Sequence, residues 1–200
     1  MKDQLFRYLV FIIGVGINSF GIAFITKSDL GTSQISSVPY VLSLNFDQIS
    51  FGTWPFLVNM LFIVIQIALL KKNFQSIQFL QIPANILFSY LIDISMAILG
   101  NFQPEFLWLK AVSLLCGCFL LALGIALEVA PDVITVPGEG IVRTIASVTK
   151  KQFGTVKVYF DLTLIITAVI LSFLFLGKLR GVGIGTVVSA LTVGRFVNLI

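Results

Sequence analysis

Two aspartates interrupt long apolar runs of this chain, and they are the first candidates for chemistry. Asp161 lies in the segment YFDLTL, near the start of one run, and Asp93 lies deep in another. Ionisable groups inside membrane helices are costly and are often functional, so we predict that Asp161 binds a solute or a coupling ion and that Asp93 is a proton or cation site. The alternatives are an ion pair of Asp161 with Lys157, four residues earlier, and an Asp93 that marks the end of its helix.

The segment PGEG contains another acidic candidate, Glu139. The glycines on both sides of Glu139 let the backbone approach a ligand closely. The alternative is an ion pair with Arg143, which follows four residues later. Thr32 and Thr135 lie beside two Gly- and Pro-containing breaks, and the helix starts that follow could offer N–H groups and a positive dipole end to an anion.

The predicted substrate-binding residues are all polar and lie in or beside apolar runs: Asn18, Thr32, Asn59, Thr135, Glu139 and Asp161. The candidates for ion coupling are Asp93 and Asp161. Asn18 shares a helical face with Gly14 and Gly21, and uncharged polar residues in helix bundles more often bond across helices than bind ligands. The same interpretation applies to Gln66, Gln81 and Asn85.

Several kinds of chemistry are excluded by residue types. The chain has no histidine, which excludes His-based acid–base catalysis, His-dependent nucleophiles and His metal sites. Cys116 and Cys118 are two residues apart in an apolar run and are interpreted as small packing residues. The segment GVGIGT, residues 181–186, lacks the lysine of a phosphate-binding loop and favours helix packing. We therefore predict no enzyme activity, catalytic residue, cofactor or metal site.

The composition is that of a membrane protein. Of the 200 residues, 58% are hydrophobic and 11% are charged, and the mean hydropathy is +1.04, whereas soluble domains are about 45–50% apolar and about 25% charged. A membrane-spanning helix needs about 20 mostly apolar residues. We predict an all-α polytopic membrane protein whose six spans cover residues 7–26, 51–70, 79–99, 108–128, 155–177 and 181–200.

The distribution of the 13 Lys and Arg residues predicts the orientation. With the N-terminus inside, nine of them fall on the inner side and four, Lys27, Lys110, Lys178 and Arg180, on the outer side. Cytoplasmic loops carry the excess of basic residues, so both termini are expected inside. The neighbouring Lys178 and Arg180 argue for the opposite orientation.

The two halves of the chain resemble each other. Six residues of the first half recur 103 positions later, among them Gly14, Gly21 and Asp29, which match Gly117, Gly124 and Asp132. The tripeptide FGT at 51–53 recurs at 153–155, and Asn59 then falls opposite Asp161. We predict two repeats, residues 1–102 and 103–200. Because each has three spans, the second would be inverted in the membrane, as in many secondary transporters; the alternative is two unrelated sets of apolar helices.

The segments 28–50 and 131–151 are long for simple connections. Each combines a Gly- and Pro-containing stretch with a short helical pattern, and in the second segment apolar and polar residues occupy opposite helical faces. Such segments suit either interfacial helices or re-entrant helices, because irregular backbone at membrane depth must line a cavity or be buried in protein.

Three motifs resemble the YczE/YyaS/YitT family of bacterial integral membrane proteins. They are LGTS before the second span, FGTxKxxFDLTL at 153–164 and GKLRGVGIGTVVSALTVG at 177–194. The resemblance covers nearly the whole chain. It implies a bacterial cytoplasmic-membrane protein with several helices, and it assigns no binding or catalytic residue.

These patterns predict a transporter of a small solute that works by alternating access at the interface of the repeats. A substrate-binding membrane subunit of a multi-component uptake system is the first alternative. A non-transporting accessory or regulatory membrane protein is the second. The expected partners are the lipid bilayer and a small-molecule solute, with a homodimer or a protein partner left open and no nucleic acid.

Overall fold

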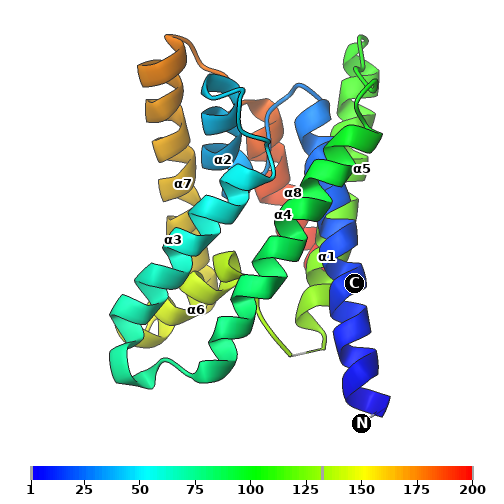
Figure 1. Ribbon diagram of the computed structural model, residues 1–200. Coiled ribbons are helices and arrows are strands. Elements are labelled where there is room, and N and C mark those ends of the chain that lie inside the picture. The colour runs from blue at the N-terminus through cyan, green and yellow to red at the C-terminus, as the bar shows by residue number, and fades with distance from the viewer. Residues whose placement is uncertain (1, 132, 200) are drawn as a thin grey trace.

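The computed structural model describes residues 2–131 and 133–199, and throughout these ranges the chain is helical or irregular, without strands (Figure 1). The predicted all-α class is confirmed. Asp132, the predicted repeat partner of Asp29, lies outside the described residues. The α-helices are α1 (Lys2–Lys27), α2 (Gln34–Asn45), α3 (Thr53–Leu70), α4 (Gln81–Ile98), α5 (Leu107–Val129), α6 (Pro137–Thr149), α7 (Phe153–Leu176) and α8 (Ile184–Leu199). Two short 3-10 helices, η1 (Lys71–Asn73) and η2 (Ser76–Leu80), connect α3 to α4.

Five helical segments of the described chain are long and apolar enough to cross a membrane. They are Gln4–Lys27, Thr53–Asn73, Ser76–Ile98, Leu107–Val129 and Phe153–Leu176. Their outer faces carry exposed apolar side chains, such as Leu61 on α3 and Ile170 on α7, as expected of helices that face lipid. The apolar part of α8, Ile184–Val197, is shorter, so the sixth span stays a prediction.

The helices α1 and α5 cross at very short range, and four glycines make this crossing possible (Figure 1). A methyl group added at Gly14 would lie 2.8 Å from the backbone nitrogen of Glu128, and one added at Gly117 would lie 2.8 Å from that of Ile25. A methyl group at Gly21 or at Gly124 would likewise meet the backbone of the opposite helix. Only glycine fits at these positions, because backbone atoms cannot move aside as a flexible side chain can.

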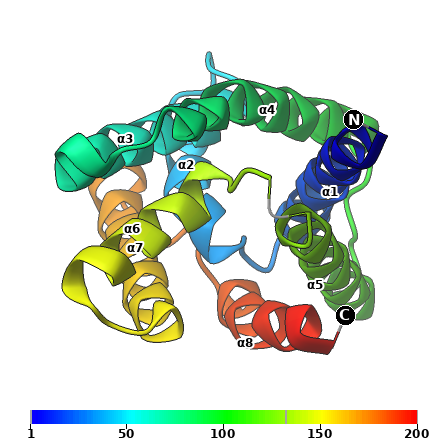
Figure 2. The ribbon, with the colours of Figure 1, turned by 90° about the horizontal axis from the view of Figure 1, so that it is seen from below.

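The remaining contacts lie both within and between the two halves of the chain, α1–α4 and α5–α8. Within the halves, α1 packs on α4 and α5 packs on α8. Between the halves, α2 packs on α7 and α6 packs on α3. In the view along the bundle, the long helices surround α2 and α6 (Figure 2). The two halves are therefore interlocked through their short helices.

The N-terminal ends of α2 and α6 meet inside the bundle. The side chain of Ile35, in the first turn of α2, occupies the space where Gly138 of α6 would carry a side chain. The amide of Gln66 in α3 donates a hydrogen bond to the Pro137 carbonyl at 3.4 Å, and the Ser37 hydroxyl donates to the Leu164 carbonyl of α7 at 3.4 Å. Each short helix is thus anchored at its start to a long helix of the other half.

Uncharged amides hold α3 against α4. Gln66 and Gln81 exchange two hydrogen bonds of 3.2 Å, and Asn59 donates to the Asn85 side chain at 2.8 Å. All four residues are buried. The prediction that such residues bond across helices is confirmed for Gln66, Gln81 and Asn85.

The glycine crossing makes a prediction for stability. We expect Gly124→Ala to lower the free energy of unfolding by about 1–3 kcal/mol, the usual cost of overpacking, because its methyl group would clash with the backbone of Asn18. Gly16 is the matched control, since a methyl group there meets nothing within 4 Å, and Gly16→Ala should leave stability unchanged or raise it by up to about 1 kcal/mol. SDS-induced unfolding in mixed micelles measures both, and equal effects of the two substitutions would contradict the crossing.

Candidate functional site

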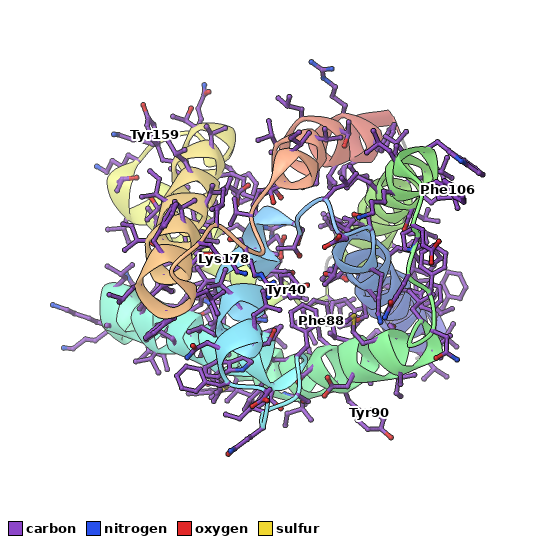
Figure 3. All side chains as sticks on the ribbon, turned by 90° about the horizontal axis from the view of Figure 1, so that it is seen from above. Tyr40, Phe88, Tyr90, Phe106, Tyr159 and Lys178 are labelled. Carbon is purple, nitrogen blue, oxygen red and sulfur yellow. The ribbon has the colours of Figure 1, made fainter. Side chains whose placement is uncertain are left out.

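A cavity of about 680 Å³ lies between the two halves of the chain, and it is lined by residues from all eight α-helices. Four of the six predicted substrate-binding residues line it: Asn18, Asn59, Glu139 and Asp161. Much of the remaining wall is apolar. In the view from above, Phe88, one of the lining residues, lies on the inner side of the ring of helices, whereas Tyr90, Phe106 and Tyr159 lie on its outside (Figure 3). An apolar chamber of this size with a few polar groups is typical of small-molecule sites.

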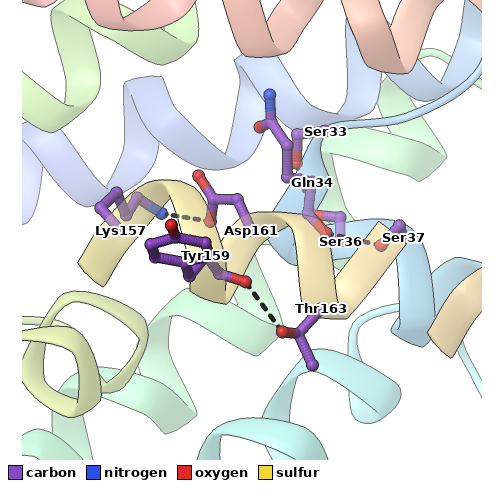
Figure 4. Close-up of polar contacts among 8 residues, drawn as sticks. All are labelled: Ser33, Gln34, Ser36, Ser37, Lys157, Tyr159, Asp161 and Thr163. Atoms are coloured by element: carbon purple, nitrogen blue, oxygen red, sulfur yellow. Dashed lines mark hydrogen bonds and ion pairs between the residues drawn. The ribbon is translucent and has the colours of Figure 1, made fainter. Parts of the chain in front are cut away.

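Asp161 forms the ion pair with Lys157 that the spacing of four predicts. The two side chains lie 2.7 Å apart on the first turns of α7, and both line the cavity (Figure 4). Ser33, Gln34 and Ser36, at the start of α2, lie nearby in the same view and also line the cavity. The positive charge of Lys157 is therefore compensated within the wall of the cavity.

Glu139 does not form the ion pair with Arg143 that the same spacing suggests. Among the described side chains, the ion pairs are Lys157–Asp161 and Lys110–Asp29. The Oε2 atom of Glu139 is buried and has no hydrogen-bond partner in the described part of the chain. Burial raises the pKa of Glu139 above its usual value, against the lowering effect of the Lys157 charge.

Glu128 is a buried acidic residue that contacts the cavity-lining Asn18, and the sequence analysis missed it. Its Oε1 atom accepts a hydrogen bond of 2.7 Å from Asn18 Nδ2, across the crossing of α5 and α1. Only 3% of Glu128 and 5% of Asn18 are exposed. Its spacing in the sequence could have identified it. Gly117, Gly124 and Glu128 lie seven and four residues apart and so share the helical face that packs on α1.

Asn18 connects Glu128 to the cavity. Its Nδ2 atom bonds the carboxylate, while its Oδ1 atom is buried and has no hydrogen-bond partner among the described residues. Since Asn18 lines the cavity, a free acceptor is available there. Together with Glu139 Oε2, the site thus offers two buried oxygen acceptors.

The helix starts of α2 and α6 add N–H groups to the wall. Neither the start of α2 after Ser33 nor the start of α6 after Val136 is capped by a side chain. Uncapped first turns have free N–H groups and a partial positive charge. Glu139 lies in the first turn of α6, where its negative charge is favoured.

The cavity is closed at one end by the segment 28–33 and the start of α8. The Leu30 carbonyl accepts a 2.7 Å hydrogen bond from the Gly185 N–H, and Thr186 Oγ1 accepts one of 3.2 Å from the Thr32 N–H. Beyond this contact lies a second pocket of about 380 Å³, whose lining residues include Asp29, Tyr40 and Arg180. The contact therefore separates two hollows.

At its other end the cavity reaches the surface of the molecule. Arg143, Phe153 and Val158 line it there and are exposed. This end lies on the side of the bundle where the chain begins and where α3 connects to α4 (Figure 1). The cavity thus reaches the surface here, whereas the contact between the segment 28–33 and α8 lies between the cavity and the second pocket.

Three predicted residues lie away from the cavity lining. Thr32 is fully buried beside Thr26, whose hydroxyl is 3.2 Å from its own, and it belongs to the closing contact. Thr135 lies half-buried in the segment before α6. Asp93 accepts hydrogen bonds from the Gly52 N–H at 2.7 Å and the Ser50 hydroxyl at 2.6 Å, just before α3 begins. The structure does not bring these three residues together with the other candidates.

The fold and the cavity define an all-helical, multi-pass membrane protein with an internal polar site. The chain belongs to a family of unknown function, DUF6198, which matches residues 5–200. The match does not confirm the resemblance to the YczE/YyaS/YitT family, which stays a prediction. None of the curated proteins and none of the solved structures compared with the chain matches it.

The hydrogen bonds of Asp93 lead to a prediction for stability. Asp93→Ala should lower the free energy of unfolding by about 1.5–3 kcal/mol, the usual worth of a hydrogen bond to a charged group, because the Gly52 N–H and the Ser50 hydroxyl lose their acceptor. Unfolding in mixed micelles checks this, with Asp47→Ala, at an exposed position before α3, as the control. A stability equal to that of the unmodified protein would contradict the structural role of Asp93.

Proposed function

We propose that this protein is a membrane transporter of a small solute that works by alternating access at the interface of its two halves. The observation that carries the proposal is the cavity, which is lined by both halves and collects Asn18, Asn59, Glu139 and Asp161 in one place. Its volume suits a metabolite-sized solute.

The proposal includes an inverted-topology repeat of residues 1–102 and 103–200. The contacts between helices support the repeat. The repeat relates α1 to α5, α2 to α6, α3 to α7 and α4 to α8. Under this exchange the contact of α2 with α7 becomes the contact of α6 with α3, and both are present. The same exchange converts α1–α4 into α5–α8 and α2–α3 into α6–α7. The four glycines of the α1–α5 crossing are also exchanged, at the predicted offset of 103.

The surroundings of the cavity support alternating access. In this proposal the contact between Leu30 and Gly185 closes one end, and the repeat predicts that residues 133–136 close the other end against the start of α4. Exchange of one contact for the other would open the site to opposite sides in turn, as in transporters with inverted repeats. The second pocket beyond the Leu30 contact would then be the vestibule of the second state.

We further propose that α8 is the sixth span, that α2 and α6 are re-entrant, and that both termini lie in the cytoplasm of a bacterium. The linkers 71–80 and 150–152 support this orientation, since they lie at the end of the bundle where the chain begins (Figure 1) and carry Lys71, Lys72, Lys150 and Lys151. Basic residues favour the cytoplasmic side. In this orientation the open end of the cavity faces the cytoplasm.

A substrate-binding subunit of an uptake complex is the alternative that the cavity supports equally. The two functions differ in whether this chain moves solute without a partner. A thermal-shift screen of the purified full chain against a metabolite library, with and without sodium and across pH, finds compounds that bind the folded state, because they raise its melting temperature by mass action. Uptake of each hit into proteoliposomes that contain this chain alone then supports the transporter, and binding without uptake contradicts it.

A cavity-filling substitution tests the site directly. Gly194 lines the cavity, and an added Cβ there meets nothing within 4 Å. Gly194→Phe should therefore leave the fold intact, fill the chamber and reduce solute affinity by more than about tenfold, a loss of at least about 1.4 kcal/mol. Gly16→Phe is the matched control, since an added Cβ there is equally unobstructed and Gly16 does not line the cavity. Full binding by the Gly194 variant would place the solute elsewhere.

Polar residues of the wall provide a separate test. Asp161→Ala or Glu139→Ala should abolish uptake of a solute found in the screen, because each removes a charge from the cavity, while the purified variants still melt cooperatively. Uptake into proteoliposomes is the measurement, and Glu105→Ala, at an exposed position outside the cavity, is the control. Normal uptake by both cavity variants would refute the assignment of the site.

A further inference from the structure

Two acidic residues at the cavity have no ion-pair partner. The charged lining residues are Glu139, Asp161, Arg143 and Lys157. Lys157 pairs with Asp161 at 2.7 Å, and Arg143 is exposed. Glu139, in the wall, and Glu128, behind the wall at Asn18, have no basic group within ion-pair distance among the described side chains. Both acidic groups therefore lack a contacting base.

Glu128 lies where a carboxylate is least favoured. It belongs to the last turn of α5, the end of a helix that carries the partial negative charge. It is 97% buried, by its 3% exposure, and its one side-chain hydrogen bond comes from the neutral amide of Asn18. A buried carboxylate without a counter-charge is costly and takes up a proton unless a positive group compensates it, so a cation bound at the site would stabilise the ionised form of Glu128.

The two side-chain atoms of the site that lack a hydrogen-bond partner are both oxygen atoms. Asn18 Oδ1 and Glu139 Oε2 are both buried, and both lack a hydrogen bond in the described part of the chain. Both are acceptors. Asn18 is 95% buried, by its 5% exposure, and lines the cavity. The missing group is therefore a donor of hydrogen bonds.

The positive dipole ends at the starts of α2 and α6 favour an anionic solute, but the free oxygen atoms of the site oppose one. Each helix start is equivalent to about half a positive charge, so the two together are equivalent to about one. Glu139 itself lies on the first turn of α6, and Glu128 lies behind Asn18. The two free atoms of the site, Asn18 Oδ1 and Glu139 Oε2, are oxygens, which repel the oxygens of an anionic group and so disfavour an anionic solute.

We infer that the transported solute is a small organic cation whose positive group carries N–H donors, a protonated amine or a guanidinium. This inference rests on the proposed function. The N–H groups bind Asn18 Oδ1 and Glu139 Oε2, and Glu128 supplies a second negative charge behind Asn18. The rest of the solute packs on apolar lining residues such as Ile22, Leu121 and Ile125. A chamber of about 680 Å³ is far larger than a bare inorganic ion needs.

Four probes with one carbon skeleton test the charge class. Butylammonium, butylguanidinium, butyramide and butyrate are added to the purified full chain at matched ionic strength, and the melting temperature is measured. We expect the two cations to raise it, and the amide and the carboxylate to leave it unchanged. A larger shift with butyrate or butyramide, or equal or absent shifts for all four probes, would overturn the inference.

Isosteric variants test the two carboxylates. Glu139→Gln keeps the shape of the side chain and removes its charge, so affinity for butylammonium should fall about tenfold to a hundredfold, the usual effect of losing a hydrogen bond to a charged group. Glu128→Gln should weaken binding in the same direction, and Glu105→Gln, outside the cavity, should not. Unchanged affinity in Glu139→Gln, with the cooperative melting of the unmodified protein, would also overturn the inference.

The outcomes separate this inference from the proposed function. Binding of butylammonium that depends on Glu139, without its uptake into proteoliposomes, supports the cation class and refutes the transporter. Binding of butyrate that Gly194→Phe abolishes refutes the cation class and leaves the transport proposal in place.

Discussion

The close crossing of α1 and α5 sets the geometry of the site. In a bilayer, lipid tails are as apolar as the helices, so helix association depends on close packing and on hydrogen bonds, and small residues permit both. Here Gly124 admits the backbone of Asn18, and Gly14 admits that of Glu128. The hydrogen bond between Asn18 and Glu128 crosses the same contact. The glycines therefore do more than join two helices, because they bring a buried acidic group into contact with Asn18, which lines the cavity.

The short helices α2 and α6 depend on a second constraint, the need to satisfy backbone polar groups. Their first turns have N–H groups that need water, a ligand or a neighbouring acceptor, and helix starts at membrane depth are tolerated where they line a cavity. Both starts lie at the cavity wall, where Ile35 packs on Gly138. Since each short helix is anchored on the other half of the chain, movement of one half against the other would carry these helix starts with it.

The sequence predicts most of the elements because apolar runs of membrane length leave few alternatives. The predicted spans and the observed helices agree within a few residues, except at the start of the first, which begins at Lys2. The sequence identifies Asn18, Asn59, Glu139 and Asp161 as polar residues in apolar surroundings, and all four line the cavity.

What the sequence could not predict depends on contacts between distant segments. Asp93 accepts a hydrogen bond from the Gly52 N–H, 41 positions away in the chain, and the Thr32 N–H bonds Thr186, 154 positions away. Glu128 is only the last residue of the predicted span 108–128 in the sequence, because its neighbour across the crossing is not visible in a linear pattern. The spacing rule for ion pairs holds for Lys157 and Asp161 but not for Glu139, whose Oε2 atom is buried at the cavity while Arg143 is exposed.

The charge of the solute also bears on how transport would be driven. The sequence contains no nucleotide-binding motif, so the free energy must come from a gradient or a partner. A membrane potential does work of about 2.3 kcal/mol per 100 mV on each charge, which corresponds to a concentration ratio of roughly 40- to 50-fold. A cationic solute would be drawn by this potential towards an inside-negative cytoplasm, the side on which the cavity is proposed to be open. The acidic residues Glu128 and Glu139 would then serve two purposes, since they select a cation at the site and thereby select a solute that the potential itself can accumulate.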